Sequence, residues 1–199
     1  MNLVLGISGL ILIAAITPGP NNLMVLQLAG ARGVKSAMPA IAGIVAGGLV
    51  LIGLSQIGLE TVASRYPWLD YVFVAVGVVY LGALGLRLVY RSFGPPETQS
   101  ESVAVAPLGA PALFVLQFAN PKAWVLVLTV SAAARAAAST RFALPLLFVV
   151  ISTASLLAWA VLGHLAARIL QGGLARARFD RVMGALLIAS AGSLALGKI

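Results

Sequence analysis

The chain has 199 residues, of which 61% are hydrophobic and only 9% are charged, and its formal net charge is +8. Soluble domains carry about 25% charged residues, so this composition excludes an ordinary water-soluble protein and predicts an all-α integral membrane protein. There is no cysteine, which excludes disulfides, thiolate metal sites and cysteine nucleophiles.

Six apolar segments are long enough, or nearly so, to cross the hydrocarbon core, which takes about 20 residues in a helix. They are residues 3–31, 37–59, 71–90, 112–134, 142–165 and 182–197. The longest polar connection, residues 91–111, is the predicted linker between halves 1–90 and 112–199 of one transmembrane domain that covers residues 1–199. Because each half has an odd number of spans, a duplicated second half would insert in the membrane with the orientation opposite to that of the first half. The sequence therefore predicts six transmembrane helices in a 3+3 inverted repeat.

Lysine and arginine counts predict the orientation of these spans. One set of connections and helix ends holds eight basic residues: Arg32, Lys35, Arg87, Arg91, Arg168, Arg176, Arg178 and Arg181. The other side holds four: Arg65, Arg135, Arg141 and Lys198. We therefore expect the first set in the cytoplasm and both termini in the periplasm. Because no basic residue precedes Arg32, no signal peptide is evident and the first segment is expected to remain. The scattered basic residues form no stripe for nucleic acid.

Two of the six segments are interrupted by proline, at matching positions in the two halves. A proline inside a helix removes a hydrogen bond and clashes with the preceding turn, at a cost of about 3 kcal/mol. Hydrocarbon tolerates such a break only where protein or a water-filled cavity satisfies the freed backbone groups. Paired breaks of this kind point to a transporter's binding site. The other prolines, Pro39 and Pro145 among them, are expected in connections or in first helical turns.

The first break supplies six candidate substrate-binding residues: Thr17, Pro18, Gly19, Pro20, Asn21 and Asn22. Carbonyls freed by an unwound turn suit a substrate ammonium, and the N–H groups that begin the next helix suit a carboxylate. The two asparagines add amide donors and acceptors at the same depth. This chemistry fits a zwitterion, with a simple kink as the alternative.

The second break supplies four more candidates: Gln117, Asn120, Pro121 and Lys122. A lysine deep in a span costs about 2.5–3.5 kcal/mol on insertion scales, so a functional role is expected. We expect Lys122 to attract a carboxylate or to bond the freed carbonyls of the first break. The alternative is a side chain that extends to the membrane interface.

His164 closes the fifth segment and is the only histidine in the chain. Imidazole exchanges protons near neutrality, so His164 is the candidate for proton coupling, and a polar cap at the interface is the alternative. The five carboxylates all fall in connections or at span ends, so we expect no metal site, no cofactor and no catalytic residue. Gly43, Gly47 and Gly48 are interpreted as a flat face for close helix packing.

The stretch from Ile16 to Asn22, followed by Gly30, Gly33 and Gly43, resembles the LysE/RhtB family of bacterial amino-acid exporters. The stretch from Leu116 to Trp124 is similar as well, and the resemblance covers essentially the whole chain. It implies gradient-driven efflux of amino acids or their derivatives through the inner membrane. Many members carry an aspartate where this chain has Gly48. The Gln117-Phe118 pair and the end of the fifth span are similar to the cysteine/O-acetylserine exporter branch.

The sequence therefore predicts a non-enzymatic, proton-driven exporter of small neutral amino acids or their derivatives in the bacterial inner membrane. The expected partners are the substrate, the lipid bilayer and a second copy of the chain in a homodimer. Export of an ion or another small metabolite within the same superfamily is the alternative. A non-transporting membrane subunit and a membrane-embedded enzyme are further alternatives.

Overall fold

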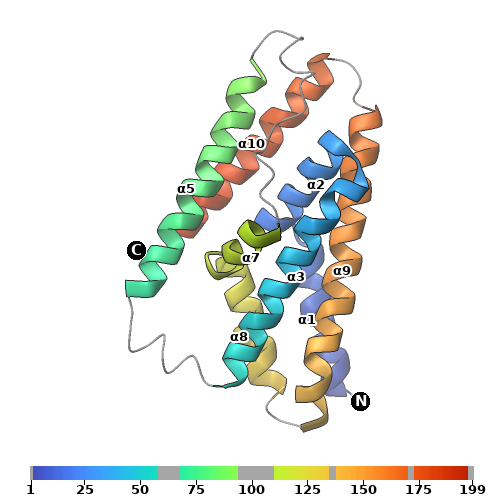
Figure 1. Cartoon of the computed structure of the whole chain (residues 1–199), viewed down its shortest axis with the longest axis vertical. Coiled ribbons are helices and arrows are strands. Elements are labelled where there is room, and N and C mark those ends of the chain that lie inside the picture. The colour runs from blue at the N-terminus through green and yellow to red at the C-terminus, as the bar shows by residue number, and fades with distance from the viewer. Residues whose placement is uncertain (1, 58–67, 94–109, 135–137, 170–172, 197–199) are drawn as a thin grey trace.

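The computed structural model describes residues 2–57, 68–93, 110–134, 138–169 and 173–196. Within these ranges the chain is helical and contains no strand (Figure 1). The helices are α1 (Asn2–Ile16), α2 (Pro20–Arg32), α3 (Val34–Gln56), α5 (Trp68–Arg91), α7 (Ala110–Phe118), α8 (Pro121–Ala134), α9 (Ala138–Ile169) and α10 (Gly173–Leu196).

Each of the six predicted spans corresponds to one helix or one bent pair of helices. Helices α3 and α9 are by themselves long and apolar enough to cross a membrane. The pairs α1–α2 and α7–α8 pass the same test when each pair is counted as one broken span. Helices α5 and α10 have 24 residues each, which is about 36 Å at 1.5 Å per residue and exceeds the hydrocarbon thickness. The all-α membrane fold is thus confirmed, with two to four candidate spans by length and composition among the described residues, and the number of six stays a prediction.

The two halves run through the molecule in opposite senses (Figure 1). In the first half the chain rises through α1 and α2, descends through α3 and rises again through α5. In the second half it descends through α7 and α8, rises through α9 and descends through α10. This alternation is what an inverted repeat requires. The predicted linker at residues 91–111 lies mostly outside the described residues.

Several helices begin earlier than the sequence indicated. Helix α3 begins at 34 rather than 37, α5 at 68 rather than 71, α7 at 110 rather than 112, α9 at 138 rather than 142, and α10 at 173 rather than 182. The prediction that Pro39 and Pro145 occupy connections or first helical turns is therefore wrong, because both lie inside helices. Hydropathy marks where a segment leaves the lipid, but polar and basic residues continue the helix beyond that point. The expected turn between α2 and α3 shrinks to Gly33, whose φ of 84° favours glycine.

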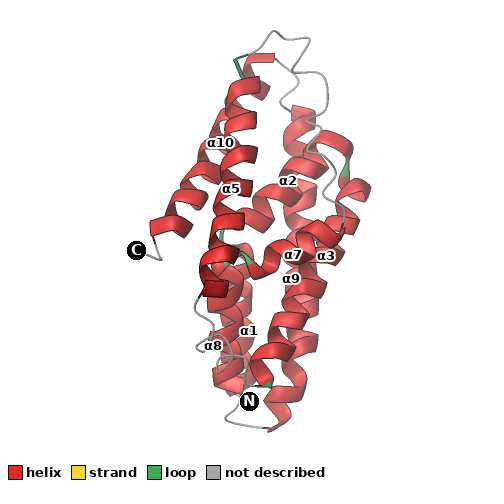
Figure 2. Cartoon of the chain, turned by 60° about the vertical axis from the view of Figure 1, so that its left-hand side comes forward, coloured by secondary structure: helices red, strands yellow, loops and turns green. Residues whose placement is uncertain are grey.

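Glycines allow close packing at the main helix contacts. Gly85 of α5 and Gly184 of α10 face each other, since a Cβ on either would come within 2.7 Å of the other's carbonyl oxygen. These two helices form a pair on one side of the molecule (Figure 2). Gly43 and Gly47 bring α3 against the backbone of α7, which confirms the predicted flat face.

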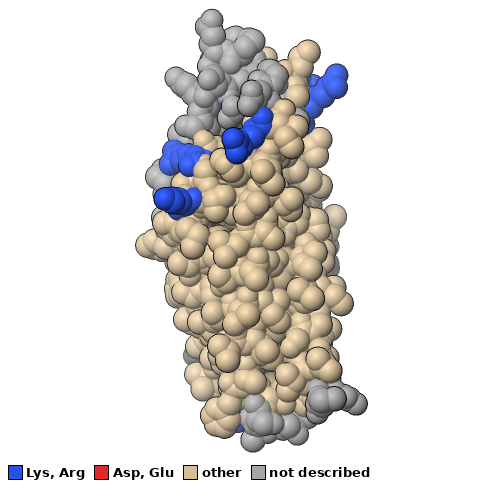
Figure 3. All heavy atoms as spheres, turned by 90° about the vertical axis from the view of Figure 1, so that its right-hand side faces the viewer, with Lys and Arg blue, Asp and Glu red and all other residues tan. Residues whose placement is uncertain are grey.

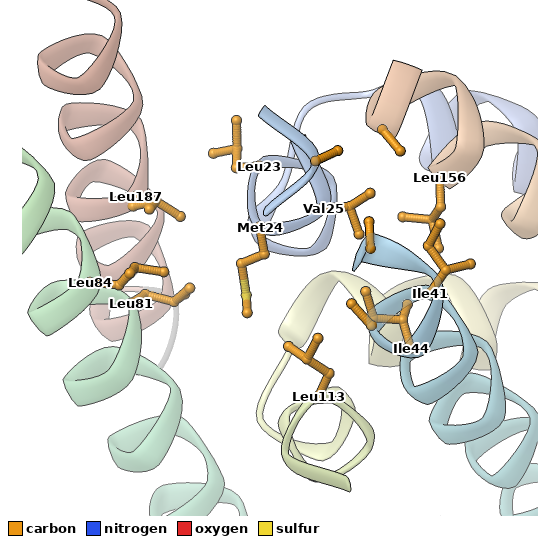
Figure 4. Packing of buried hydrophobic residues seen from close by; sticks show 14 of the residues in the cluster. Leu23, Met24, Val25, Ile41, Ile44, Leu81, Leu84, Leu113, Leu156 and Leu187 are labelled. Carbon is orange, nitrogen blue, oxygen red and sulfur yellow. The ribbon is translucent and has the colours of Figure 1, made fainter. Parts of the chain in front are cut away.

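Two hydrophobic clusters fill the interior. The larger cluster joins α2, α3, α7 and α9 to the α5–α10 pair, where Leu84 and Leu187 lie on the side that faces Met24 (Figure 4). The smaller cluster joins α1, α3, α8 and α9 around residues such as Ile11 and Leu144.

Charge is concentrated near one end of the molecule. One face shows Lys and Arg side chains gathered mostly at that end, above a broad middle belt without charged residues (Figure 3). Helices α2, α5 and α9 end there with Arg32, Arg91 and Arg168. At the opposite end the Arg141 guanidinium donates to the side chain and carbonyl of Gln56, over 3.3 Å each.

Candidate functional site

The first break separates α1 from α2 and bends the span by 53°. Pro18 and Pro20 cannot donate backbone hydrogen bonds, and each disfavours the helical conformation in the residue before it. Gly19 accordingly adopts an extended conformation, with φ −164° and ψ 175°. Proline fits the first position of a helix, and α2 begins with Pro20.

Side chains satisfy several carbonyls that the first break frees. The Asn22 amide donates to the carbonyls of Ala15 and Thr17, over 2.8 and 2.9 Å. The Ser155 hydroxyl of α9 also donates to Ala15, over 2.8 Å. The Thr17 hydroxyl donates over 2.6 Å to the Ile13 carbonyl, which keeps its backbone partner, the Thr17 N–H. Freed carbonyls of the unwound turn are thus satisfied within the protein, as a break at membrane depth requires, while Thr17 and Pro18 themselves are exposed.

The second break separates α7 from α8 and bends that span by 66°. Asn120 caps α8, because its side-chain oxygen accepts a hydrogen bond from the Lys122 backbone N–H over 3.1 Å. Pro121 occupies the first helical position. The Trp124 indole donates to the Phe118 carbonyl over 2.8 Å, which satisfies one of the groups freed at the end of α7.

The two breaks lie side by side and are joined by side chains. The amides of Asn21 and Gln117 donate to each other, over 3.0 and 3.1 Å. The Lys122 ammonium donates to the Thr17 carbonyl and packs over Gly19, where a Cβ would lie 3.1 Å from Nζ. Of the roles expected for Lys122, the structure thus shows the bond to a freed carbonyl of the first break.

A partly open cavity lies at the level of the two breaks, with about 590 Å³ of empty space that includes the solvent at its opening. Seven of the ten candidate substrate-binding residues line it: Gly19, Pro20, Asn21, Asn22, Gln117, Asn120 and Lys122. Thr17 and Pro18 are absent from the lining, although Thr17 takes part through its carbonyl, and the side chain of Pro121 lies outside the described part of the chain. Among the described lining residues, Lys122 alone carries a charge.

The remaining wall of the cavity was not predicted from the sequence. It is formed by residues of α1, α3, α8 and α9: Ala14, Ala15, Ile44, Gly48, Ala123, Leu126, Val127, Phe148, Ser152 and Leu156. Most are ordinary apolar residues, which look the same in sequence whether they face lipid or a cavity. Ser152 is the only described polar residue among them. Its hydroxyl in the middle of an apolar segment is the one feature of this wall from which the sequence could have predicted a residue that faces the cavity.

His164 is half-buried on α9 and does not line the cavity. It lies 12 residues beyond Ser152, which corresponds to about 18 Å along the helix axis. Within the described part of the chain, no three His, Cys, Asp or Glu residues are grouped so that they could hold a metal ion.

The family follows from a comparison of the whole chain. Residues 12–198 match the family model described as LysE type translocator. The chain belongs to this family. Both breaks and all the lining residues named above lie within the matched range.

Several curated relatives match over part of the chain. A leucine efflux protein from Salmonella choleraesuis is 32% identical over 110 residues, or 54% of this chain and 51% of the relative. A threonine efflux protein from Salmonella typhi is 28% identical over 116 residues, or 56% of each chain. An uncharacterized membrane protein from Pseudomonas aeruginosa is 36% identical over 126 residues, or 60% of this chain and 56% of the relative. The matches thus span about half the length of these relatives, and no solved structure matches significantly.

Proposed function

We propose that this protein is a secondary-active exporter of neutral amino acids or their derivatives, driven by the proton gradient across the bacterial inner membrane. The single observation that carries the proposal is the cavity at the two breaks, where amides and one cation lie beside an apolar wall. Membership of a translocator family and the names of the efflux relatives support it. Transport of this kind needs no covalent step and no cofactor.

The carboxylate of the substrate binds at the start of α2 in this proposal. That helix has 13 residues, and no side chain caps its N-terminus. Uncapped N–H groups and the helix dipole favour an anion there. The Lys122 ammonium on the neighbouring break adds a positive charge beside Gly19.

The substrate ammonium binds amide oxygens that retain acceptor capacity. A carboxamide oxygen has two lone pairs. The bonds between Asn21 and Gln117 use one lone pair on each oxygen, so each can accept one further bond. The Thr17 carbonyl already accepts from Lys122 and Asn22, which uses both of its lone pairs, so it can bind the ammonium only if one of these donors is displaced.

Transport proceeds by alternating access around this site. Because Asn21–Gln117 and Thr17–Lys122 tie the two breaks together, a change in the bend of one break is transmitted to the other. The positive-inside rule places the basic end, with Arg32 and Arg168, in the cytoplasm and both termini in the periplasm. His164 remains the candidate proton carrier, and its distance from the cavity implies coupling through a shift of α9. Assembly as a homodimer is also part of the proposal.

The test is efflux from proteoliposomes that contain the purified protein. Vesicles are preloaded with radiolabelled leucine, alanine or lysine, and efflux is followed with and without a pH gradient. We expect gradient-stimulated efflux of leucine and alanine, no efflux of lysine, and none from vesicles with Asn21→Leu protein. Leucine and alanine efflux no faster than from protein-free vesicles would overturn the proposal. Efflux at the same rate with and without a pH gradient would show that protons do not drive transport.

A further inference from the structure

The cavity has a polar side and an apolar side. Asn21, Gln117 and Lys122 form the polar side, at the breaks. The apolar side comes from α3, α8 and α9 and consists mainly of Ile44, Leu126, Val127, Phe148 and Leu156. If the ammonium and carboxylate of an amino acid bind at the polar side, its side chain extends toward the apolar side. A charged side chain there would be buried without a described partner of opposite charge, which is costly.

Phe148 presents the largest side chain on the apolar side, and its position depends on Gly48. The side chain is only 6% exposed, and its ring lies directly against the α3 backbone. A Cβ built on Gly48 would fall within 2.6 Å of ring atom Cε1 and closer still to Cζ. The missing side chain of Gly48 is therefore what allows the ring to rest there.

We propose that Phe148, seated on Gly48, is the residue that sets the size of substrate side chain that the cavity accepts. This inference rests on the proposed function and refines its substrate class to amino acids with aliphatic side chains, such as valine, leucine and methionine. The ring occupies space that an aromatic substrate side chain would need. It also offers an apolar surface against which an aliphatic side chain packs.

The first test removes the ring. Efflux of phenylalanine and of leucine is measured from proteoliposomes with wild-type and Phe148→Leu protein, and the ratio of the two rates is compared. We expect the phenylalanine-to-leucine ratio to rise at least tenfold, because one methylene in an apolar pocket already changes discrimination by about 10–200-fold. Phe142→Leu is the matched control, since Phe142 lies on the same helix but is 84% exposed. Its ratio should equal that of the wild type.

The second test pushes the ring into the cavity. Gly48→Ala should lower leucine efflux at least tenfold relative to alanine, because the ring must move away from the new methyl group. Adding Phe148→Leu to Gly48→Ala should restore the leucine-to-alanine ratio, which shows that the glycine acts through the ring. Gly53→Ala on the same helix is the control, because a Cβ there meets nothing within 4 Å.

The outcomes separate the two proposals. A wild-type protein that exports none of these amino acids contradicts the proposed function. A wild-type protein that exports leucine, with an unchanged phenylalanine-to-leucine ratio in Phe148→Leu, contradicts only the role of Phe148. Both ratios are measured within one protein preparation, so a lower yield of a variant does not affect them. If Gly48→Ala does not fold, the Phe148→Leu ratio decides alone.

Discussion

Asn21 and Gln117 lie 96 residues apart in the chain, and their side-chain amides donate hydrogen bonds to each other over 3.0 and 3.1 Å. Asn21 lies in the first turn of α2 and Gln117 near the end of α7. The pair fixes the relative height of the two broken spans, so that Lys122 reaches the Thr17 carbonyl. One contact between the halves thus aligns the remaining polar groups of the cavity.

Gln117→Leu should therefore destabilise the protein by about 1–3 kcal/mol, because it removes both bonds and leaves the Asn21 amide without its partner. The midpoint of thermal unfolding in detergent micelles measures the loss. Gln27→Leu is the matched control, since Gln27 is also buried but its Nε2 has no hydrogen-bond partner among the described residues. That variant should be neutral or stabilised. Equal losses in both variants would contradict the importance of the Asn21–Gln117 pair.

Lys122→Met should lower substrate efflux at least tenfold. The change removes the cation of the cavity and a charge-assisted bond to Thr17, and hydrogen bonds to charged groups contribute about 1.5–3 kcal/mol. Lys122→Arg keeps the charge but adds bulk beside Gly19, so it should recover only part of the rate. Initial efflux rates from proteoliposomes measure both. Lys35→Met, at the exposed start of α3, should export like the wild type. Efflux by Lys122→Met at the wild-type rate would show that Lys122 does not contribute to transport.

Much of the polar side of the site could be predicted from sequence, because proline has a fixed structural consequence. Two prolines around Gly19, and one after Asn120, interrupt the helix at both places, whereas the isolated Pro39 and Pro145 lie inside helices. A lysine at the depth of the second break needs a partner. The predicted inversion of the halves then places the breaks near each other. These arguments use backbone chemistry, which depends little on how the helices pack.

The apolar side could not be predicted in the same way. Phe148 and Leu156 do not differ in sequence from lipid-facing neighbours such as Leu146, which is 67% exposed. Only the rotation of α9 about its axis decides which of them face the cavity. Gly48 was interpreted as part of a flat packing face, and it does allow close contact. The partner in that contact is a side chain that lines the cavity, which the sequence does not reveal.

Gly43→Ala should destabilise the protein by about 1–3 kcal/mol, because the new methyl group would overlap the backbone of Ala110 and force α3 and α7 apart. A flexible side chain could move aside, whereas this backbone cannot without moving α7. The shift in the midpoint of thermal unfolding in detergent micelles measures the loss of stability. Gly53→Ala, where a Cβ meets nothing within 4 Å, should gain up to about 1 kcal/mol from helix propensity. The same shift in both variants would contradict the close α3–α7 contact.

His164→Gln should abolish the stimulation of efflux by a pH gradient but leave exchange intact. Glutamine keeps hydrogen-bonding capacity and cannot carry a proton near neutral pH. Exchange of internal labelled for external unlabelled leucine needs no net proton movement and serves as the internal control. Because His164 lies about 18 Å from Ser152 along α9, substrate affinity should be unchanged. Gradient-driven efflux at the wild-type rate would show that another group carries the proton.

The proposed orientation is tested by single cysteines, which the natural chain lacks. Lys35→Cys marks the basic end and Arg141→Cys the opposite end, and both native side chains are exposed. We expect a membrane-impermeant maleimide to label Arg141→Cys in intact spheroplasts and Lys35→Cys only after lysis. Each change removes one basic residue, and the proposed cytoplasmic end still carries more basic residues than the opposite end. The unsubstituted chain gives the background. Labelling of Lys35→Cys but not Arg141→Cys before lysis would invert the topology, and leucine would then have to leave through the basic end.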